Sequence, residues 1–300
     1  MRRAFRLVAL LLALAALTVG CQSYRLGQGP ALLPPEPQAL RIATHNVHYI
    51  IMGRDEGRWS EGGWHLRKPA FQATFAALNA DIVAYQEMES FARGSGNPTN
   101  LALSFLLENN PEYGAAAQGD PARFPSTQPI LYRKSRLTAL DQGWFFFSET
   151  PDTIYSRTFN GSYPAFASWA RFRTKGGATF RVLNVHLDAF SRSNRRRSAA
   201  LITERMAPWL DRGEPLFLVG DTNELASSAL METLTAPGLS LLKTPGATYH
   251  FDRGINLFGA IDHIAHSPGP QPLGAPVVYR QKFGTHWPSD HYPVAADFRL

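Results

Sequence analysis

Residues 215–224 read Pro-Leu-Phe-Leu-Val-Gly-Asp-Thr-Asn-Glu and join four apolar residues directly to a polar turn. The apolar run between Pro215 and Gly220 predicts a short buried strand. Asp221 and Asn223 are two residues apart, so on an extended chain they project from one face. A carboxylate beside a carboxamide suits a hard cation, a phosphate oxygen or an attacking water. The same pair also favours an Asx turn, in which the side chains bond only their own backbone. This stretch alone leaves both interpretations open.

Polar residues stand at the ends of other predicted strands as well. Apolar strands are predicted at residues 40–48, 81–87, 129–133, 179–186 and 260–264, and a last strand follows the turn Ser289-Asp290-His291. The polar residues at these ends are Asn46, Glu87, His186, Asp262, Asp290 and His291. Each one alone is explained equally well as a solvated strand end or a core residue. Together they predict a site on polar tips held by rigid strands.

Helices are predicted between the strands, at residues 66–79, 100–109, 191–210 and 227–234. Residues 165–173 and 179–186 flank the turn Lys175-Gly176-Gly177, which predicts an antiparallel hairpin. The run Gly143-Trp144-Phe145-Phe146-Phe147 predicts a buried strand, with a membrane-touching aromatic patch as the alternative. Alternating helices and strands with hairpins predict one α/β domain of two packed, mainly antiparallel sheets with helices outside them.

Composition narrows the function classes. The chain has 300 residues, of which 44% are apolar, enough for a sizeable core. A single cysteine excludes an intramolecular disulfide framework and a cysteine-based zinc cluster. The formal charge is +6; without Arg2, Arg3 and Arg6 of the leader, 27 basic residues face 24 acidic ones, or +3. This charge is too small to indicate a nucleic-acid-binding protein by itself.

The N-terminus predicts export. Arg2, Arg3 and Arg6 precede the apolar run 7–17, which suits a signal peptide over residues 1–20 and is shorter than the ~20 residues of a membrane span. Leu17-Thr18-Val19-Gly20-Cys21 resembles a bacterial lipobox, although Thr18 stands where that motif usually has leucine. Cys21 would then be lipidated and attach the chain to a membrane. A chance cysteine after an ordinary signal peptide is the alternative.

Residues 21–39 carry several glycines and prolines, which predict a non-helical, semi-extended tether that holds the domain at 40–300 off the membrane. Gln22 is not the aspartate that retains enteric-type lipoproteins at the inner membrane, so the outer membrane, facing the periplasm, is expected. Export and lipidation together predict a cell-envelope lipoprotein, expected to be a monomer.

The order of these residues resembles the endonuclease/exonuclease/phosphatase superfamily, which includes DNase I-like nucleases, abasic endonucleases, neutral sphingomyelinases and inositol polyphosphate phosphatases. The resemblance covers about residues 40–300, and its sharpest motifs are Gly220-Asp221-Thr222-Asn223 and Ser289-Asp290-His291. It implies a four-layer α/β/β/α sandwich with the site at one rim of the two sheets.

The resemblance also implies a division of roles. Glu87 would be the main ligand of Mg²⁺, or of Mn²⁺, with Asn46 beside it and Asp290 in the metal-side shell. Asp221 would orient or deprotonate the attacking water, and Asn223 would hold a phosphate oxygen. Asp262 would pair with His291, and His186 would help neutralise the pentavalent phosphorus. His48 departs from abasic endonucleases, which carry an acidic residue there; an imidazole is a poor Mg²⁺ ligand.

These roles predict a Mg²⁺-dependent phosphoesterase that acts outside the cytoplasm. A polyanionic substrate would suit the arginines offered as phosphate contacts, which are Arg133, Arg195, Arg196 and Arg197, although such charge runs more often form a solvated face. The substrate is a phosphate ester, and a nucleic acid, a lipid head group and an inositol phosphate all remain open. A specific DNA or RNA nuclease is one alternative. An inactive envelope lipoprotein that binds phosphorylated ligands is another.

Overall fold

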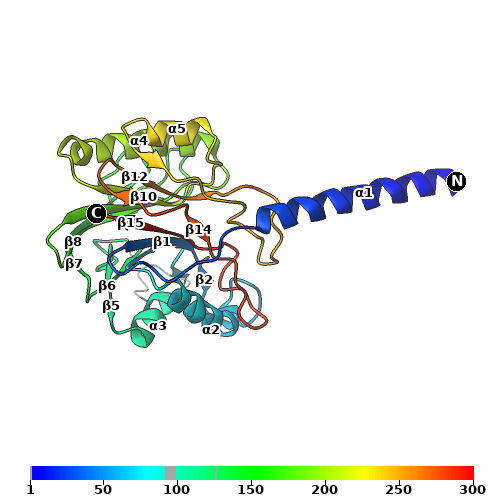
Figure 1. Ribbon diagram of the computed structural model, residues 1–300, viewed down its shortest axis with the longest axis horizontal. Coiled ribbons are helices and arrows are strands. Elements are labelled where there is room, and N and C mark those ends of the chain that lie inside the picture. The colour runs from blue at the N-terminus through cyan, green and yellow to red at the C-terminus, as the bar shows by residue number, and fades with distance from the viewer. Residues whose placement is uncertain (1, 92–98, 126) are drawn as a thin grey trace.

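Two β-sheets pack face to face, and helices cover the outer face of each (Figure 1). The computed structural model describes residues 2–91, 99–125 and 127–300. Helices α2 (Glu61–Leu78) and α3 (Leu101–Asn109) cover the first sheet. Helices α4 (Arg192–Asp211) and α5 (Ala229–Thr235) cover the second. This arrangement confirms the four-layer α/β/β/α sandwich.

The first sheet has seven strands and is built around its innermost pair, β1 and β3. Its order is β13 (Gln271–Pro272), β15 (Val294–Arg299), β1 (Leu40–Asn46), β3 (Ile82–Gln86), β6 (Ile130–Arg133) and β5 (Tyr113–Ala116), with β14 (Val277–Val278) also paired to β15. Strands β1 and β3 are parallel and are joined through α2, whereas the other pairs are antiparallel.

The second sheet repeats this plan with six strands. Its order is β11 (Ser240–Leu241), β12 (Asp262–His266), β10 (Leu216–Asp221), β9 (Thr179–His186), β8 (Phe166–Thr174) and β7 (Leu137–Phe146). Here β9 and β10 are the parallel pair, joined through α4, and the remaining pairs are antiparallel. A short separate ladder joins β2 (Ile50–Ile51) to β4 (Ser90–Phe91). Both sheets are therefore mainly antiparallel, as predicted.

Apolar side chains fill each of the three interfaces between layers. Ile42, Ile82, Phe172 and Phe217 belong to the cluster between the two sheets. The aromatic run predicted as a buried strand lies in β7 and just after it, where Phe145, Phe146 and Phe147 are buried. Burial of all three phenylalanines excludes the alternative of a membrane-touching patch at this run.

Helices α2, α3, α4 and α5 each begin where a serine or asparagine caps the first turn, Ser228 in the case of α5. Ser60 Oγ accepts the N–H of Gly63 at 2.8 Å, so α2 starts earlier than residue 66, where its apolar periodicity becomes visible. Ser191 and Asn100 cap α4 and α3 in the same way. The predicted helices therefore exist, and the capping residues account for the shifts in their first residues.

The N-terminal segment differs from the expected free tether. Helix α1 (Arg2–Gly27) runs through Cys21, so residues 22–27 are helical, because the first proline of the segment is Pro30. The part of α1 from Phe5 to Gly27 is long and apolar enough to cross a membrane, as a signal sequence can also be. Leu33 O accepts a hydrogen bond from Arg41 at 2.7 Å. Residues 22–27 therefore depart from the predicted non-helical tether, whereas residues 28–38 are mostly exposed and touch the domain at points such as Leu33.

Candidate active site

The carboxyl ends of the two parallel pairs meet at one rim of the sandwich. Asn46 stands opposite Gln86 at the ends of β1 and β3, and Asp221 stands opposite His186 at the ends of β10 and β9. Asp262, the first residue of β12, is the antiparallel partner of Asp221. The turn before β15 adds His291, because β15 runs antiparallel to β1. Sheet register therefore collects the polar residues that the sequence places at strand ends.

Asn46 connects the two sheets across this rim. Its Nδ2 donates to Glu87 Oε1 at 3.1 Å and to Asp221 Oδ2 at 3.0 Å. His186 Nε2 lies 3.7 Å from Glu87 Oε1 and 3.8 Å from Asp221 Oδ2. One amide and one imidazole therefore lie between a carboxylate from each sheet, which is the convergence expected from the sequence.

The two oxygens of Asp221 serve different purposes. Oδ1 accepts the backbone N–H of Asn223 at 2.9 Å, which is the Asx turn. Oδ2 faces the site, where it accepts from Asn46 and lies 3.8 Å from His291 Nε2. The Asx turn is therefore present, and it holds Asp221 with Oδ2 directed toward the other polar residues of the rim.

Asp262 and His291 form a buried pair. His291 Nδ1 lies 2.9 Å from Asp262 Oδ2, and the ring of Tyr249 packs 4.9 Å from the imidazole. Burial alone would lower the pKa of His291, but the carboxylates of Asp262 and Asp221 outweigh it and raise the pKa to about 10. The pKa of Asp262 is lowered, because the charge and hydrogen bond of His291 outweigh its burial. The pair is thus an imidazolium held by a carboxylate.

Asp221 is tuned in the opposite direction. Burial and the neighbouring charge of Asp262 raise the pKa of Asp221 to about 6, although His291 and His186 oppose the shift. A carboxylate whose pKa lies near neutral pH is well matched to accepting a proton from a water molecule. The raised pKa suits Asp221 to act as a general base.

Backbone strain marks the same two strand ends. Glu87 follows β3 with φ 54°, and Asn223 follows β10 with φ 51°, both in the left-handed region that side chains other than glycine rarely adopt. Gly220 has φ 137°, and a Cβ there would come within 1.9 Å of Val185 O. The close approach of β9 therefore requires glycine one residue before Asp221.

A buried polar link lies beneath the site and was missed by the sequence analysis. Gln86 Nε2 donates to Asn184 Oδ1 at 2.7 Å, and Asn184 Nδ2 donates to Tyr85 O at 2.8 Å. Both side chains are fully buried and join β3 to β9. A polar residue one or two places before the end of an apolar strand is the signal that could have identified them.

Asp290 has a partner that the sequence did not reveal. Arg58 NH2 donates to Asp290 Oδ2, and Ser289 Oγ donates to the backbone oxygen of Asn46 at 2.7 Å. The pKa of Asp290 is lowered: burial would raise it, but the positive charges of His291 and Arg58 outweigh burial. Because a guanidinium already occupies this carboxylate, Asp290 is a weaker candidate for a metal ligand than Glu87.

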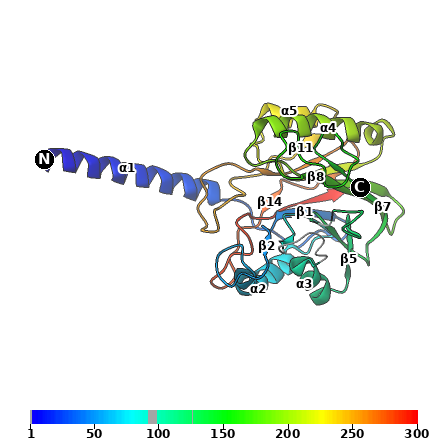
Figure 2. The ribbon, with the colours of Figure 1, turned by 180° about the vertical axis from the view of Figure 1, so that it is seen from behind.

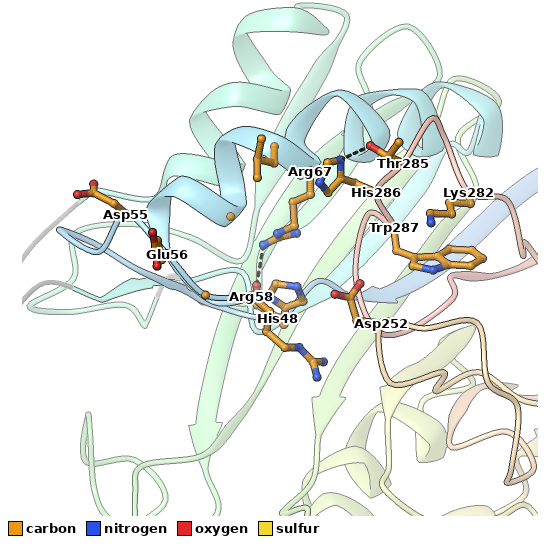
Figure 3. A pocket seen from close by; sticks show the side chains of 13 residues that line it. His48, Asp55, Glu56, Arg58, Arg67, Asp252, Lys282, Thr285, His286 and Trp287 are labelled. Carbon is orange, nitrogen blue, oxygen red and sulfur yellow. Dashed lines mark hydrogen bonds between the residues drawn. The ribbon is translucent and has the colours of Figure 1, made fainter.

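A cavity of about 390 Å³, lined by charged side chains and by Leu66 and Trp287, opens at Arg58, the partner of Asp290 (Figure 3). Arg58, His48 and Asp252 lie close together at one side, and Trp287 and Lys282 come from the loop before Ser289. The buried Arg67 also lines it and donates to His48 O at 3.1 Å and to Pro288 O at 2.6 Å. Charged groups of both signs and one indole give this cavity the character of a site for a polar group.

The donor set at the rim fits a hard divalent cation. Glu87 offers a carboxylate that is 25% exposed. The side-chain amide of Asn46 stands next to it with Nδ2 toward Glu87, and its Oδ1, which accepts the backbone N–H of His48 at 3.1 Å, would have to turn toward a cation to bind it. Oxygen donors of this kind are those that Mg²⁺ and Mn²⁺ prefer. Asp221, Asp262 and His291 also place potential ligand atoms within 4.8 Å of one another. The Asp262–His291 hydrogen bond already accounts for that second cluster, so Glu87 and Asn46 are the stronger candidates.

The four arginines offered as phosphate contacts lie in different surroundings. Arg133 is at the far end of β3 from Glu87, because its N–H donates to Asp81 O and its NH2 donates to Asn79 Oδ1 at 2.7 Å. The expectation that Arg133 contacts a phosphate at this rim is therefore wrong. It faces the start of β3, about six residues or ~20 Å from Glu87 along the strand.

The arginines of α4 are mostly engaged elsewhere. Arg195 Nε donates to Glu224 Oε1 at 2.9 Å, and its NH1 donates to Asp188 O at 2.8 Å. Arg197 pairs with Glu149 and stacks on the ring of Phe159. Arg196 is exposed. Arg195 therefore braces the loops that follow His186 and Asn223, and the solvated-face interpretation describes Arg197.

Asn223 also differs from its expected role in the state described. Its Nδ2 donates to Leu187 O at 2.8 Å, which ties the loop after β10 to the loop after β9. His48 Nδ1 lies 3.3 Å from Tyr49 O, and burial and Arg67 lower the pKa of His48 to about 3. The neutral imidazole of His48 thus lines the cavity and is not required as a cation ligand.

Comparisons with known proteins agree with this geometry. A model of the Endonuclease/Exonuclease/phosphatase family matches residues 43–291. A family protein from Bacteroides thetaiotaomicron is 27% identical, with a TM-score of 0.71 over 89% of this chain and 98% of its own. A mannosyl-6-phosphatase of the same organism is 26% identical, with a TM-score of 0.71 over 87% of this chain and 100% of its own.

More distant structures share the fold. The catalytic domain of human nocturnin, solved with a bound sulfate anion, is 15% identical, with a TM-score of 0.60 over 89% of this chain and 96% of its own. Curated proteins yielded no match.

Proposed function

The chain belongs to the endonuclease/exonuclease/phosphatase family of hydrolases acting on phosphoester bonds, and from this premise we propose a Mg²⁺-dependent phosphoesterase that works outside the cytoplasm. The observation that carries the proposal is the position of Asp221. Its carboxylate, with a raised pKa, faces a charged imidazole and the carboxylate–amide pair of the opposite sheet. A proton acceptor, a fixed positive charge and a cation-binding carboxylate within one rim are the parts that hydrolysis of a phosphate ester requires.

Each side chain would act at a defined atom. Asp221 Oδ2 would orient the attacking water and take its proton, since Oδ1 is held by the turn. His291, kept charged by Asp262, would stabilise negative charge on the phosphate oxygens in the transition state, and His186 would support it from the other side. Glu87 and Asn46 would hold Mg²⁺, which when bound supplies positive charge to the phosphate.

The cavity beside Asp290 would receive the alcohol part of the ester. Its lining combines Trp287 with charged groups, a mixture suited to a polyhydroxylated group, which can stack on an indole and bond carboxylates and guanidinium groups. The likeness to a mannosyl-6-phosphatase supports a phosphorylated sugar or sugar-like head group. We therefore favour a small phosphate ester over a nucleic acid, and the mature charge of +3 agrees with that choice.

The location follows from the N-terminus. Cys21 is exposed on an apolar helix, which agrees with lipid attachment there after export and with a position in the cell envelope, at the outer membrane. Fractionation of cells that produce the wild type or Cys21→Ser tests this. The wild type is expected with the membranes and the variant in the soluble fraction. Equal partition of the two would remove the lipid anchor.

The chemistry is tested by Asp221→Asn. Asparagine keeps the turn but removes the charge that accepts the proton, so turnover should fall by about 100-fold or more. Turnover would be measured with sugar phosphates, inositol phosphates, a chromogenic phosphodiester, sphingomyelin, DNA and RNA, each with Mg²⁺ and with a chelator. Thermal melting controls for folding. A variant that melts and turns over like the wild type would refute the mechanism and favour a binding protein.

A further inference from the structure

The rim that carries the catalytic groups also exposes apolar side chains. Phe190, four residues beyond the end of β9, is 93% exposed, and Phe258, four residues before β12, is 55% exposed. Leu225 is exposed on the loop after β10, and Ile255 is exposed on the same loop as Phe258. We call these four residues the apolar rim. Single exposed apolar side chains are common on protein surfaces, but several on neighbouring loops at one rim indicate a partner outside the chain.

These residues belong to one connected surface. Arg195 bonds both Glu224 and the backbone oxygens of Asp188 and Ala189, which brings the loops of Leu225 and Phe190 together. A Cβ on Gly259 would come within 3.2 Å of Leu225 Cδ2, so the loop that carries Phe258 adjoins Leu225. The loops that carry the apolar rim are therefore neighbours along the second sheet's edge of the site.

The segment that follows Cys21 is seated on the same loops. Gln22 Nε2 donates to Leu257 O at 3.3 Å, and Ser23 Oγ accepts the N–H of Asn256 at 2.9 Å. Leu26 O accepts the N–H of Ala247 at 2.9 Å. A Cβ on Gly246, which has φ 67°, would lie 2.1 Å from Leu26 O, so this approach is close on both sides. These hydrogen bonds hold the residues next to Cys21, the proposed lipidation site, against the loop that carries Phe258.

The direction of the chain agrees with these contacts. Helix α1 leaves the domain on the side opposite the C-terminus in both views (Figures 1 and 2). The C-terminus follows β15, which is antiparallel to β1, so the ends of β1 and β3 point toward α1. At the opposite end, the turn between β8 and β9 exposes Lys175, Gly176 and Gly177. The two ends of the same strands therefore differ in polarity.

We infer that the apolar rim docks on the surface of the bilayer to which Cys21 is attached, with the catalytic groups facing that membrane. The inference rests on the proposed lipid attachment. Bulky apolar side chains on loops beside a lipid anchor insert into the boundary between head groups and acyl chains, which turns one signal for membrane binding into two. The seated segment keeps the domain from rotating away, because its hydrogen bonds hold the anchor at the rim.

The orientation is tested by site-directed spin labelling of the full chain as the cell exports and modifies it. Phe190→Cys places a nitroxide on the apolar rim, and Lys175→Cys places a matched one beyond the other end of β9. The strand alone, Thr179–His186, separates these positions by about 25 Å. Both side chains are exposed, so neither change disturbs the core. Reconstitution uses vesicles of phosphatidylethanolamine and phosphatidylglycerol.

On reconstitution, the label at position 190 should lose access to a water-soluble nickel relaxing agent and gain access to oxygen. The label at position 175 should keep its access to water. Equal water access at both positions in protein that sediments with the vesicles would overturn the inference and leave the lipid anchor intact. Labelling of the parent chain, whose sole cysteine is Cys21, would instead show that no lipid is attached, and the inference would fall together with the proposed anchor.

Discussion

The two halves of the sandwich place a carboxylate at the same topological position with different surroundings. In the first half, β1–α2–β3 leads to Glu87, whose side chain is 25% exposed. In the second half, β9–α4–β10 leads to Asp221, whose side chain is 2% exposed. Both follow a parallel pair of strands and both are joined to Asn46. The same connection therefore delivers two carboxylates to one rim, and burial decides how they differ.

The difference in burial separates the two tasks. A carboxylate at the water boundary remains a charged ligand and exchanges water for a cation with little cost. A buried carboxylate next to Asp262 has a raised pKa, which makes it a better proton acceptor. The comparison teaches that one repeated supersecondary unit delivers an accessible carboxylate and a buried one, which in the proposed mechanism are the metal ligand and the base.

Asp262→Asn should cause the largest effect, because it removes the charge that keeps His291 protonated. We expect turnover to fall by about 10²- to 10³-fold, the range for losing a group that stabilises transition-state charge. The pKa of His291 should fall, since Asp262 is the main group that raises it, and the alkaline limb of the rate profile should move to lower pH. The measurement is turnover against pH with a matched thermal melt.

The companion change Asp290→Asn serves as the control, because Asp290 also raises the pKa of His291, but its carboxylate bonds Arg58 and Ser289 instead of the imidazole ring. Its shift of the alkaline limb should be smaller. A well-folded Asp262→Asn protein whose profile overlays that of the wild type would show that the second half does not depend on this pair.

A pH dependence of stability sharpens the contrast, since a second buried imidazole has the opposite charge state. Burial lowers the pKa of His250 to about 3, whereas that of His291 is raised to about 10. His250 stays neutral in the folded chain but takes up a proton in the unfolded chain below about pH 6.5. Its contribution is therefore lost as the pH falls, and that of His291 is lost as the pH rises toward 10.

Between pH 7 and pH 5 the contribution of His250 should fall by about 2 kcal/mol. Urea unfolding of the wild type and of His250→Gln at both pH values measures it, because the other titrating groups are common to both proteins. The difference in unfolding free energy between the two proteins should change by about that amount. A difference that stays constant would show that His250 is protonated in the folded state.

Much of this comparison was visible in the sequence, because strand ends and turn residues are local features. The buried run before Gly220 and each polar strand end are set by residues within a few positions of one another, and the family motifs fixed the order of the strand ends. Arg58 and Arg133 show where the approach stops. Arg58 pairs with Asp290, which is 232 residues away in the sequence. Arg133 ends β6, and because β6 is antiparallel to β3, this end lies beside the start of β3. Long-range register decides both positions.

Glu87→Gln should have the smallest effect, and it tests the first half directly. Glutamine keeps an oxygen donor but loses the charge, so the Mg²⁺ concentration for half-maximal activity should rise by about tenfold, which is about 1.4 kcal/mol of binding free energy. Because water reaches this carboxylate, solvent compensates part of the loss. Turnover at saturating Mg²⁺ should stay closer to the wild type than that of Asp221→Asn.

The increase in melting temperature on adding Mg²⁺ reports binding without activity, and it should require more Mg²⁺ in Glu87→Gln but not in Asp221→Asn. Equal Mg²⁺ requirements in both variants would mean that the two carboxylates share one task, and the distinction between the halves would fail.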